Sequence, residues 1–141
     1  KHTWKLGLLS LLFLIAFSSC TKEIQEAEVE VENECTTSTC RALLGEWNLM
    51  RYSAGLAGME SYNQDDITWT FNSNGTVDVL INITLSNSYM PIQTSQTVNY
   101  VINGTELSVD NGRYDFTING SELTLSDHPE VDGPIIFLER D

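Results

Sequence analysis

The chain has 141 residues, of which 20 are acidic and 7 are lysine or arginine, so its formal net charge at pH 7 is −13. Such a charge repels nucleic acid phosphates and anionic membrane surfaces, which argues against both as partners held by charge. The simplest role of the acidity is to keep an exported protein soluble, and a cationic partner is the alternative.

The first twenty residues predict a removable signal peptide that ends at a lipid-attachment cysteine. Lys1 and Lys5 flank the start of an apolar run over residues 6–17, and small residues then lead to Cys20. The run is shorter than the roughly 20 residues that cross a bilayer. The motif Phe-Ser-Ser-Cys resembles the lipobox of bacterial lipoproteins. The resemblance implies cleavage after residue 19, acyl chains on Cys20 and an anchor in the outer membrane, on its periplasmic or its surface-exposed face.

Residues 20–42 are expected to form the lipid anchor and an acidic tether, because residues 21–34 hold six glutamates and few large apolar side chains. The alternative is an export address, since acidic residues soon after a lipidated cysteine resemble surface-sorting signals. If Cys20 carries the lipid, Cys35 and Cys40 are the two cysteines that remain. An even number of cysteines in an oxidising envelope compartment predicts a disulfide between them. A zinc site is the rival, but two thiols without further ligands nearby do not complete one.

From residue 43 onward, apolar and polar residues alternate with a period of two, as in half-buried strands. Asn-Gly dipeptides at residues 74–75, 103–104, 111–112 and 119–120 predict tight type I′ hairpin turns, in which both residues have positive φ. Cutting the chain at its turns gives eight strands, at about residues 45–51, 67–72, 76–85, 96–102, 106–109, 113–118, 122–126 and 134–139. One helical turn is expected near residues 56–62.

These strands predict an all-β domain over residues 43–141. Each of the first seven has one apolar face, as an antiparallel barrel or sandwich requires, and consecutive short turns favour up-and-down order. Eight such strands can close and remove both sheet edges. We therefore predict a small eight-stranded antiparallel up-and-down barrel, with a β-sandwich or a partly open barrel as the alternative. Residues 135–138 are apolar on both faces, so the register of the last strand stays open.

The ends of the domain resemble a known family. Gly45-Glu46-Trp47 opens the first strand and Arg140 closes the last, which resembles the lipocalin pattern. The resemblance covers residues 43–141 and implies that Arg140 packs across Trp47 and closes one end of the barrel. Short strands and the inward aromatic side chains of Trp47, Trp69, Phe71 and Phe116 predict a mostly filled interior.

Two long connections are the candidate ligand-binding segments. By the resemblance, residues 52–66 correspond to a lid over the open mouth, where Leu56, Met59 and Tyr62 would cover an apolar ligand. Residues 86–95 add Tyr89 and Met90. The alternatives are a loop that packs onto the barrel and shields its end, and an ordinary hairpin loop.

Other chemistry has little support in the sequence. Asp127, Glu130 and Asp132 could gather around calcium, but their spacing does not match an EF-hand loop, so a solvated turn is expected. His128 has no obvious nucleophile, and there is no Gly-x-Ser-x-Gly elbow or phosphate loop. We therefore expect no enzyme, metal or cofactor.

The function expected from the sequence is that of a membrane-anchored lipoprotein whose barrel binds a small apolar or amphipathic ligand at its mouth. Two alternatives remain. The first is an interaction or inhibitor domain whose acidic surface meets a cationic envelope protein, and the second is a structural lipoprotein with no small ligand.

Overall fold

The computed structural model describes residues 35–86 and 89–141. The expected signal peptide, the lipidation site Cys20 and the glutamate-rich residues 21–34 lie outside these ranges. Within the described part, no helix is long and apolar enough to cross a membrane.

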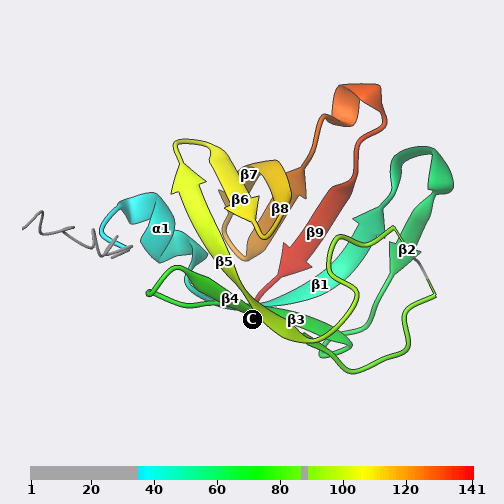
Figure 1. Ribbon diagram of the computed structural model, residues 1–141, viewed down its shortest axis with the longest axis horizontal. Helices are drawn as coiled ribbons and strands as arrows, with labels where there is room; N and C mark the ends of the chain where they lie inside the picture. The colour runs from blue at the N-terminus through cyan, green and yellow to red at the C-terminus, as the bar shows by residue number, and fades with distance from the viewer. Residues whose placement is uncertain (1–34, 87–88) are drawn as a thin grey trace, which may run out of the picture. The chain divides into compact units, whose positions relative to one another are not determined.

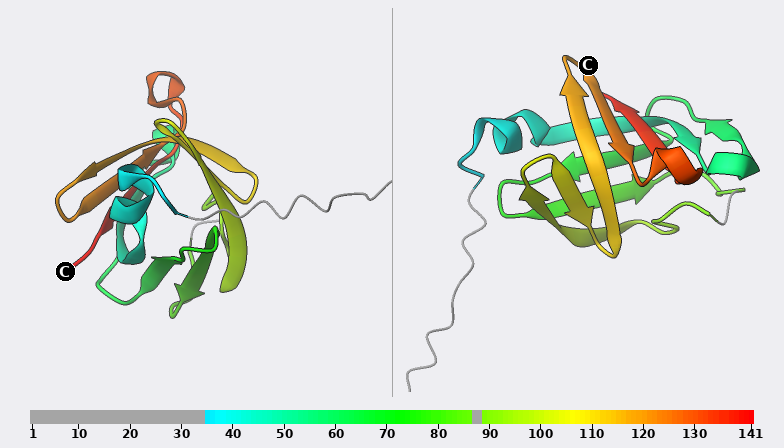
Figure 2. Two further views of the ribbon diagram at one scale, coloured as in Figure 1. Left: turned by 90° about the vertical axis from the view of Figure 1, so that its left-hand side faces the viewer. Right: turned by 90° about the horizontal axis from the view of Figure 1, so that it is seen from above.

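The domain is a closed antiparallel barrel of eight strands with one additional strand. The strands are β1 (Gly45–Ser53), β2 (Met59–Ser61), β3 (Ile67–Phe71), β4 (Thr76–Ile81), β5 (Gln96–Asn103), β6 (Glu106–Val109), β7 (Gly112–Asn119), β8 (Glu122–Ser126) and β9 (Ile135–Glu139). The sheet order is β2-β1-β3-β4-β5-β6-β7-β8-β9, and β1 also pairs with β9 (Figures 1 and 2). The predicted up-and-down barrel is confirmed, and the sandwich and partly open alternatives are wrong.

Strand β1 is longer than predicted and bends, so that its last residues also pair with the extra strand β2. Its first half pairs with β3, while its second half pairs with both β9 and β2. The register with β9 shifts at Met50, a β-bulge that lets the strand turn. The freed carbonyl of Met50 accepts a hydrogen bond from the Tyr62 N–H at 2.9 Å. The helical turn expected near residues 56–62 is instead a short 3-10 turn, Gly55–Ala57, followed by β2.

Strand β4 ends at Ile81, four residues earlier than predicted. Its last N–H donates to the side-chain oxygen of Ser95 at 2.8 Å, in place of a backbone carbonyl of β5. The next residue, Asn82, turns toward β3 and donates from its backbone to the Asp66 carbonyl. Residues 82–85 therefore keep the alternation of apolar and polar side chains, but they do not extend the hydrogen-bonded pairing of β4 with its neighbours.

The hairpin turns differ from the predicted type I′ pairs. The β5–β6 and β7–β8 hairpins place glycine first in a two-residue loop, with Gly104 at φ 65° and Gly120 at φ 63°. The preceding asparagines, Asn103 and Asn119, are the last paired residues of their strands. In the β6–β7 hairpin, the positive φ of 51° belongs to Asp110. In these three hairpins the Asn-Gly dipeptide lies at the turn, but the two loop residues are displaced by one position from the predicted pair.

The side chains expected on one face of each strand line the barrel interior. Ile81, Ile83, Val98, Ile102 and Ile118, near strand ends or just beyond them, are only partly buried. In the last strand, whose register the sequence left open, Ile136 and Leu138 point into the barrel and are each 1% exposed. The other two apolar residues of β9, Ile135 and Phe137, are half-buried, and the Arg51 guanidinium covers the Phe137 ring at 4.5 Å.

A six-residue helix, α1 (Ser38–Leu43), covers the end of the barrel at which β1 begins (Figure 2). It was not predicted, because residues 35–42 had been assigned to the tether. The Thr37 hydroxyl caps the helix by accepting from the Cys40 N–H at 3.1 Å. Burial of Leu43 then holds the helix against the barrel.

Beneath α1, Trp47 and Arg140 close this end of the barrel. The Trp47 indole N–H donates to the Leu43 carbonyl at 2.8 Å. The Arg140 guanidinium carbon lies 4.4 Å from the centroid of the Trp47 ring, and its Nη1 donates to the Ala42 carbonyl at 3.0 Å. The side chains that seal this end therefore come from both ends of the folded domain and from the helix.

Candidate ligand site at the barrel mouth

The opposite end of the barrel, here called the mouth, is covered by residues 89–95. Met90 and Ile92 of this segment are buried in the core, at 4% and 2% exposure. The Tyr52 hydroxyl donates to the Tyr89 carbonyl at 2.7 Å, and the Tyr62 hydroxyl oxygen lies 3.3 Å from the Met90 sulfur. The mouth is therefore shielded by a loop that packs into it.

The structure brings together only part of the predicted ligand-binding set. Tyr62, Tyr89 and Met90 lie at the mouth, joined by the contacts just described. Leu56 and Met59 are 90% and 56% exposed. None of these five residues is among those that line the cavity described next.

A cavity of about 250 Å³ lies between the 89–95 loop and the β6–β7 hairpin. Its lining residues are Trp69, Pro91, Ile92, Val109, Asp110, Asn111, Gly112 and Tyr114. Ligand pockets for drug-sized molecules begin at roughly 300 Å³, so this cavity suits a smaller molecule.

The walls of this cavity are apolar and its rim is polar. Trp69, Ile92 and Val109 are buried, whereas Asp110 and Asn111 are exposed at the hairpin. At Gly112 a Cβ atom would collide with the hydroxyl end of the Tyr114 side chain, so a larger residue there would displace that ring. Sequence reasoning identified Asn111-Gly112 as a turn but gave no signal that it faces residues 91–92, because that contact depends on how the loop folds back.

One buried polar group of a residue that lines this cavity has no partner among the described residues. Trp69 is 1% exposed, and its indole N–H has no hydrogen-bond acceptor among the described residues. Leaving a buried donor unpaired costs on the order of 1–3 kcal/mol. Such groups are uncommon in folded proteins, and each calls for an explanation such as a bound water or ligand.

Burial also changes the acidity of the tyrosines around the mouth. It raises the pKa of Tyr114 to about 12, with smaller contributions from Tyr52, Asp127 and Asp110. Burial likewise raises the pKa of Tyr62, helped by the hydrogen bond that its hydroxyl donates to Glu60. These hydroxyls therefore stay protonated at neutral pH and act as neutral hydrogen-bonding groups.

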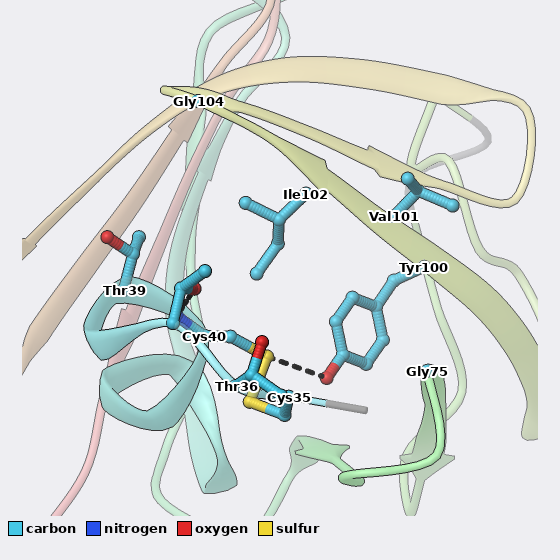
Figure 3. Close-up of a pocket in the computed structure, with 10 residues that line it drawn as sticks. Cys35, Thr36, Thr39, Cys40, Gly75, Tyr100, Val101, Ile102 and Gly104 are labelled. Carbon is cyan, nitrogen blue, oxygen red and sulfur yellow. Dashed lines mark hydrogen bonds between the residues drawn. A yellow bond between two sulfur atoms is a disulfide. The ribbon is translucent and has the colours of Figure 1, made fainter. Parts of the chain in front are cut away.

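A second cavity of about 250 Å³ lies at the closed end, between α1 and strand β5 (Figure 3). The disulfide between Cys35 and Cys40 forms one wall, which confirms the predicted bond. Tyr100 points toward it, with its hydroxyl 3.8 Å from the Cys40 sulfur (Figure 3). The same hydroxyl donates to the Asn72 carbonyl at 2.8 Å.

The described residues place no group of three histidine, cysteine, aspartate or glutamate side chains where it could hold a metal ion. Asp127, Glu130 and Asp132 lie around a short 3-10 turn, Pro129–Val131, between β8 and β9. The Asp127 carboxylate contacts the imidazole of His128 at 2.5 Å, and this hydrogen bond raises the pKa of His128.

Comparisons with protein-family models and with curated proteins returned no match for this chain.

Proposed function

We propose that this protein is a lipid-anchored envelope lipoprotein whose lipocalin-like barrel binds a small apolar or amphipathic molecule in the mouth cavity. The observation that carries the proposal is the cavity itself. It combines apolar walls from Trp69, Ile92 and Val109 with a polar rim at residues 110–111. Such a combination suits a molecule that buries an apolar body and leaves a polar group near the opening.

The rest of the interior limits where and how large the ligand can be. Trp47, Phe71 and Leu123 fill the barrel below the mouth and are each at most 2% exposed. A long acyl chain threaded along the barrel axis therefore has no space, and the ligand is a compact molecule held near the opening.

Cavity filling tests this proposal. The full chain, purified from bacterial membranes in mild detergent, should carry a small molecule that organic extraction and mass spectrometry detect. Val109→Phe places a ring in the cavity and should abolish that enrichment. Val131→Phe makes the same change at a position that is 72% exposed and does not line the cavity, so it should retain the molecule. Equal extracts from the original chain and Val109→Phe would exclude ligand binding at the mouth.

The membrane anchor is tested separately. Cys20→Ser removes the sulfur that the proposed lipobox would have modified and should release the chain from the outer membrane or leave the signal uncleaved. Stable attachment takes two or more acyl chains, so the change should be large in membrane fractionation. Unchanged fractionation with normal cleavage would contradict the anchor.

A second candidate function has its own supporting observation. The outer face of the barrel exposes acidic residues on several strands, among them Glu46, Asp115 and Glu122. A cationic envelope protein could bind this surface. Because charges on a surface are screened over about 10 Å at 0.1 M salt, such a complex should be lost as salt rises. Partners that stay bound at high salt would argue against this function.

A further inference from the structure

We propose that two neighbouring turns of the barrel form a docking surface for a protein segment in which lysine or arginine flanks apolar side chains. The turns are residues 54–58, between β1 and β2, and residues 127–134, between β8 and β9; together they are called the paired turns. The proposal rests on the second candidate function, a cationic envelope partner, and specifies where that partner binds. It does not depend on a ligand in the mouth cavity.

The paired turns are joined by a close backbone contact. Ile135 of β9 pairs with Ser53 on β1 and with Ser126 on β8, so both turns begin at the same level of the sheet. They lie side by side at the end of the barrel far from α1 (Figures 1 and 2). A Cβ atom at Gly55 would overlap with the Asp132 carbonyl oxygen, and the φ of Gly55 is 61°, which glycine adopts readily. The two turns therefore present one surface.

Apolar side chains are exposed on this surface. Leu56 is 90% exposed, Val131 is 72% exposed, and Met59, the first residue of β2, is 56% exposed. Among the described residues six large apolar side chains are exposed, and these are three of them. Single exposed apolar residues are ordinary, whereas several gathered at one place mark an interaction site. Leu56 and Val131 each adjoin the backbone contact between the turns, so they are gathered.

Hydrogen bonds within each turn fix its backbone. The Gly58 N–H donates to the Gly55 carbonyl at 3.1 Å in the first turn. In the second, the N–H groups of Val131 and Gly133 donate to the His128 carbonyl at 3.0 and 3.1 Å. A surface that is ordered before its partner arrives loses less conformational entropy on binding, which favours association.

The charges beside the apolar side chains select the partner. Residues 52–66 and 114–139 contain no lysine or arginine, and their single histidine, His128, contacts Asp127. Glu130 and Asp132 flank Val131 and are exposed. A segment that is both basic and apolar complements this surface, because apolar contacts form the centre of an interface and opposite charges around it determine which partners bind. A second copy of this chain or an anionic membrane would instead be repelled.

Three short peptides with blocked ends separate the apolar and the charged contributions. Lys-Leu-Lys-Leu-Lys carries both, Lys-Ser-Lys-Ser-Lys carries only the charge, and Glu-Leu-Glu-Leu-Glu reverses the charge. The full ¹⁵N-labelled chain in a non-ionic detergent is titrated with each peptide at low salt, and the free aqueous peptide is measured in the same sample. We expect the first peptide to bind about tenfold more tightly than the second, and the third to bind most weakly. The first should shift the amide resonances of residues 55–58 and 130–132.

A pair of substitutions tests the apolar part of the surface. Leu56→Ser with Val131→Ser should lower the affinity for Lys-Leu-Lys-Leu-Lys about tenfold, to that of the serine peptide. The matched control is Leu80→Ser with Val101→Ser, on β4 and β5, where the side chains are 49% and 51% exposed. This control should leave the affinity unchanged. All four positions lie outside the buried core, so the barrel should stay folded in both variants.

A second pair tests the charges. Glu130→Gln with Asp132→Asn should weaken the binding of both lysine peptides and reduce its dependence on salt. Asparagine suits position 132, where φ is 61°. Glu46→Gln with Glu122→Gln removes the same charge near the opposite ends of β1 and β8 and should change the affinity little.

The outcomes separate this inference from the function on which it rests. If Lys-Leu-Lys-Leu-Lys binds the original chain and the Leu56→Ser, Val131→Ser variant equally, a cationic partner binds elsewhere and the paired turns are not its site. If neither lysine peptide shifts any resonance, the second candidate function fails as well. Equal binding of Glu-Leu-Glu-Leu-Glu would overturn the selection by charge. In phosphatidylcholine nanodiscs with spin-labelled headgroups, preferential broadening of residues 55–58 and 130–132 would assign the turns to the membrane and overturn the proposal.

Discussion

Replacing Arg140 by methionine tests how the closed end of the barrel is held. The guanidinium lies 4.4 Å above the Trp47 ring, its Nη1 donates to the Ala42 carbonyl at 3.0 Å, and its Nη2 reaches the Gly120 carbonyl at 3.4 Å. It therefore joins three segments: the first strand, helix α1 and the β7–β8 turn. Methionine keeps much of the apolar contact with the indole but removes the charge and all donors.

The magnitude follows from these contacts. A half-buried cation over an indole contributes about 1 kcal/mol. The hydrogen bond from the charged Nη1 to Ala42 adds about 1.5 kcal/mol, while the 3.4 Å contact with Gly120 adds little. Methionine packing recovers part of this, so we expect Arg140→Met to lower the free energy of unfolding by about 2 kcal/mol. For a domain of this size, the thermal midpoint should fall by roughly 10 °C.

The assay is urea and thermal unfolding of the full chain, followed by tryptophan fluorescence and circular dichroism. Arg51→Met is the matched control, because Arg51 also covers an aromatic ring, Phe137 at 4.5 Å, but is itself exposed on the outer face. It should cost only about 0.5 kcal/mol. If both variants lose the same small stability, the reasoning about closure at Trp47 is refuted.

Three further predictions concern the disulfide, alkaline stability and the mouth loop. Replacing Cys35 and Cys40 by alanine opens a six-residue loop and should lower stability by about 2 kcal/mol in the chain-entropy account, measured by thermal unfolding; no change would show that α1 packing alone fixes this segment. Burial raises the pKa of Tyr114 to about 12, above the value near 10 in an unfolded chain, so its contribution to stability is complete below pH 10 and is lost as the pH rises to 12. Tyr114→Phe should therefore flatten the fall in stability between pH 10 and 12 in urea titrations, and an unchanged slope would place the alkaline sensitivity elsewhere. Tyr52→Phe removes the hydrogen bond to the Tyr89 carbonyl and should cost about 1 kcal/mol, with faster amide hydrogen exchange in residues 90–95; unchanged exchange would mean that the bond does not hold the loop.

The barrel itself could be predicted because its signals are local. Alternation buries one face of each strand, and a slip by one residue would expose Val77 and Val79 and bury Asp78, so the pattern fixes the register. Glycine-containing turns mark where β3, β5, β6 and β7 end, even where the loop residues shift by one. Residues 135–138 do not alternate, and only the pairing of this strand with β1 and β8 determines which of its side chains point inward.

The candidate site was less predictable, because it depends on contacts between segments that are distant in the sequence. The loop over residues 86–95 was identified, yet nothing local indicated that Met90 and Ile92 would be buried while Leu56 would be exposed. Which of these side chains is buried depends on how much space the barrel leaves at its mouth and on the contacts of the Tyr52 and Tyr62 hydroxyls with the loop.

By itself, the amino-acid sequence determined the all-β class, the barrel and the inward face of seven strands, because each depends on spacing along the chain, and it predicted the disulfide from the number of cysteines. Only the tertiary structure decided that residues 38–43 form a helix over the closed end, that β1 bends to pair with β2, and that the mouth holds a small cavity beside Trp69. The physical reason is that each of these features depends on contacts between groups that are distant along the chain, as the lack of a hydrogen-bond acceptor for the Trp69 indole N–H among the described residues illustrates. Those groups come from strands and loops that the chain brings together only when it folds.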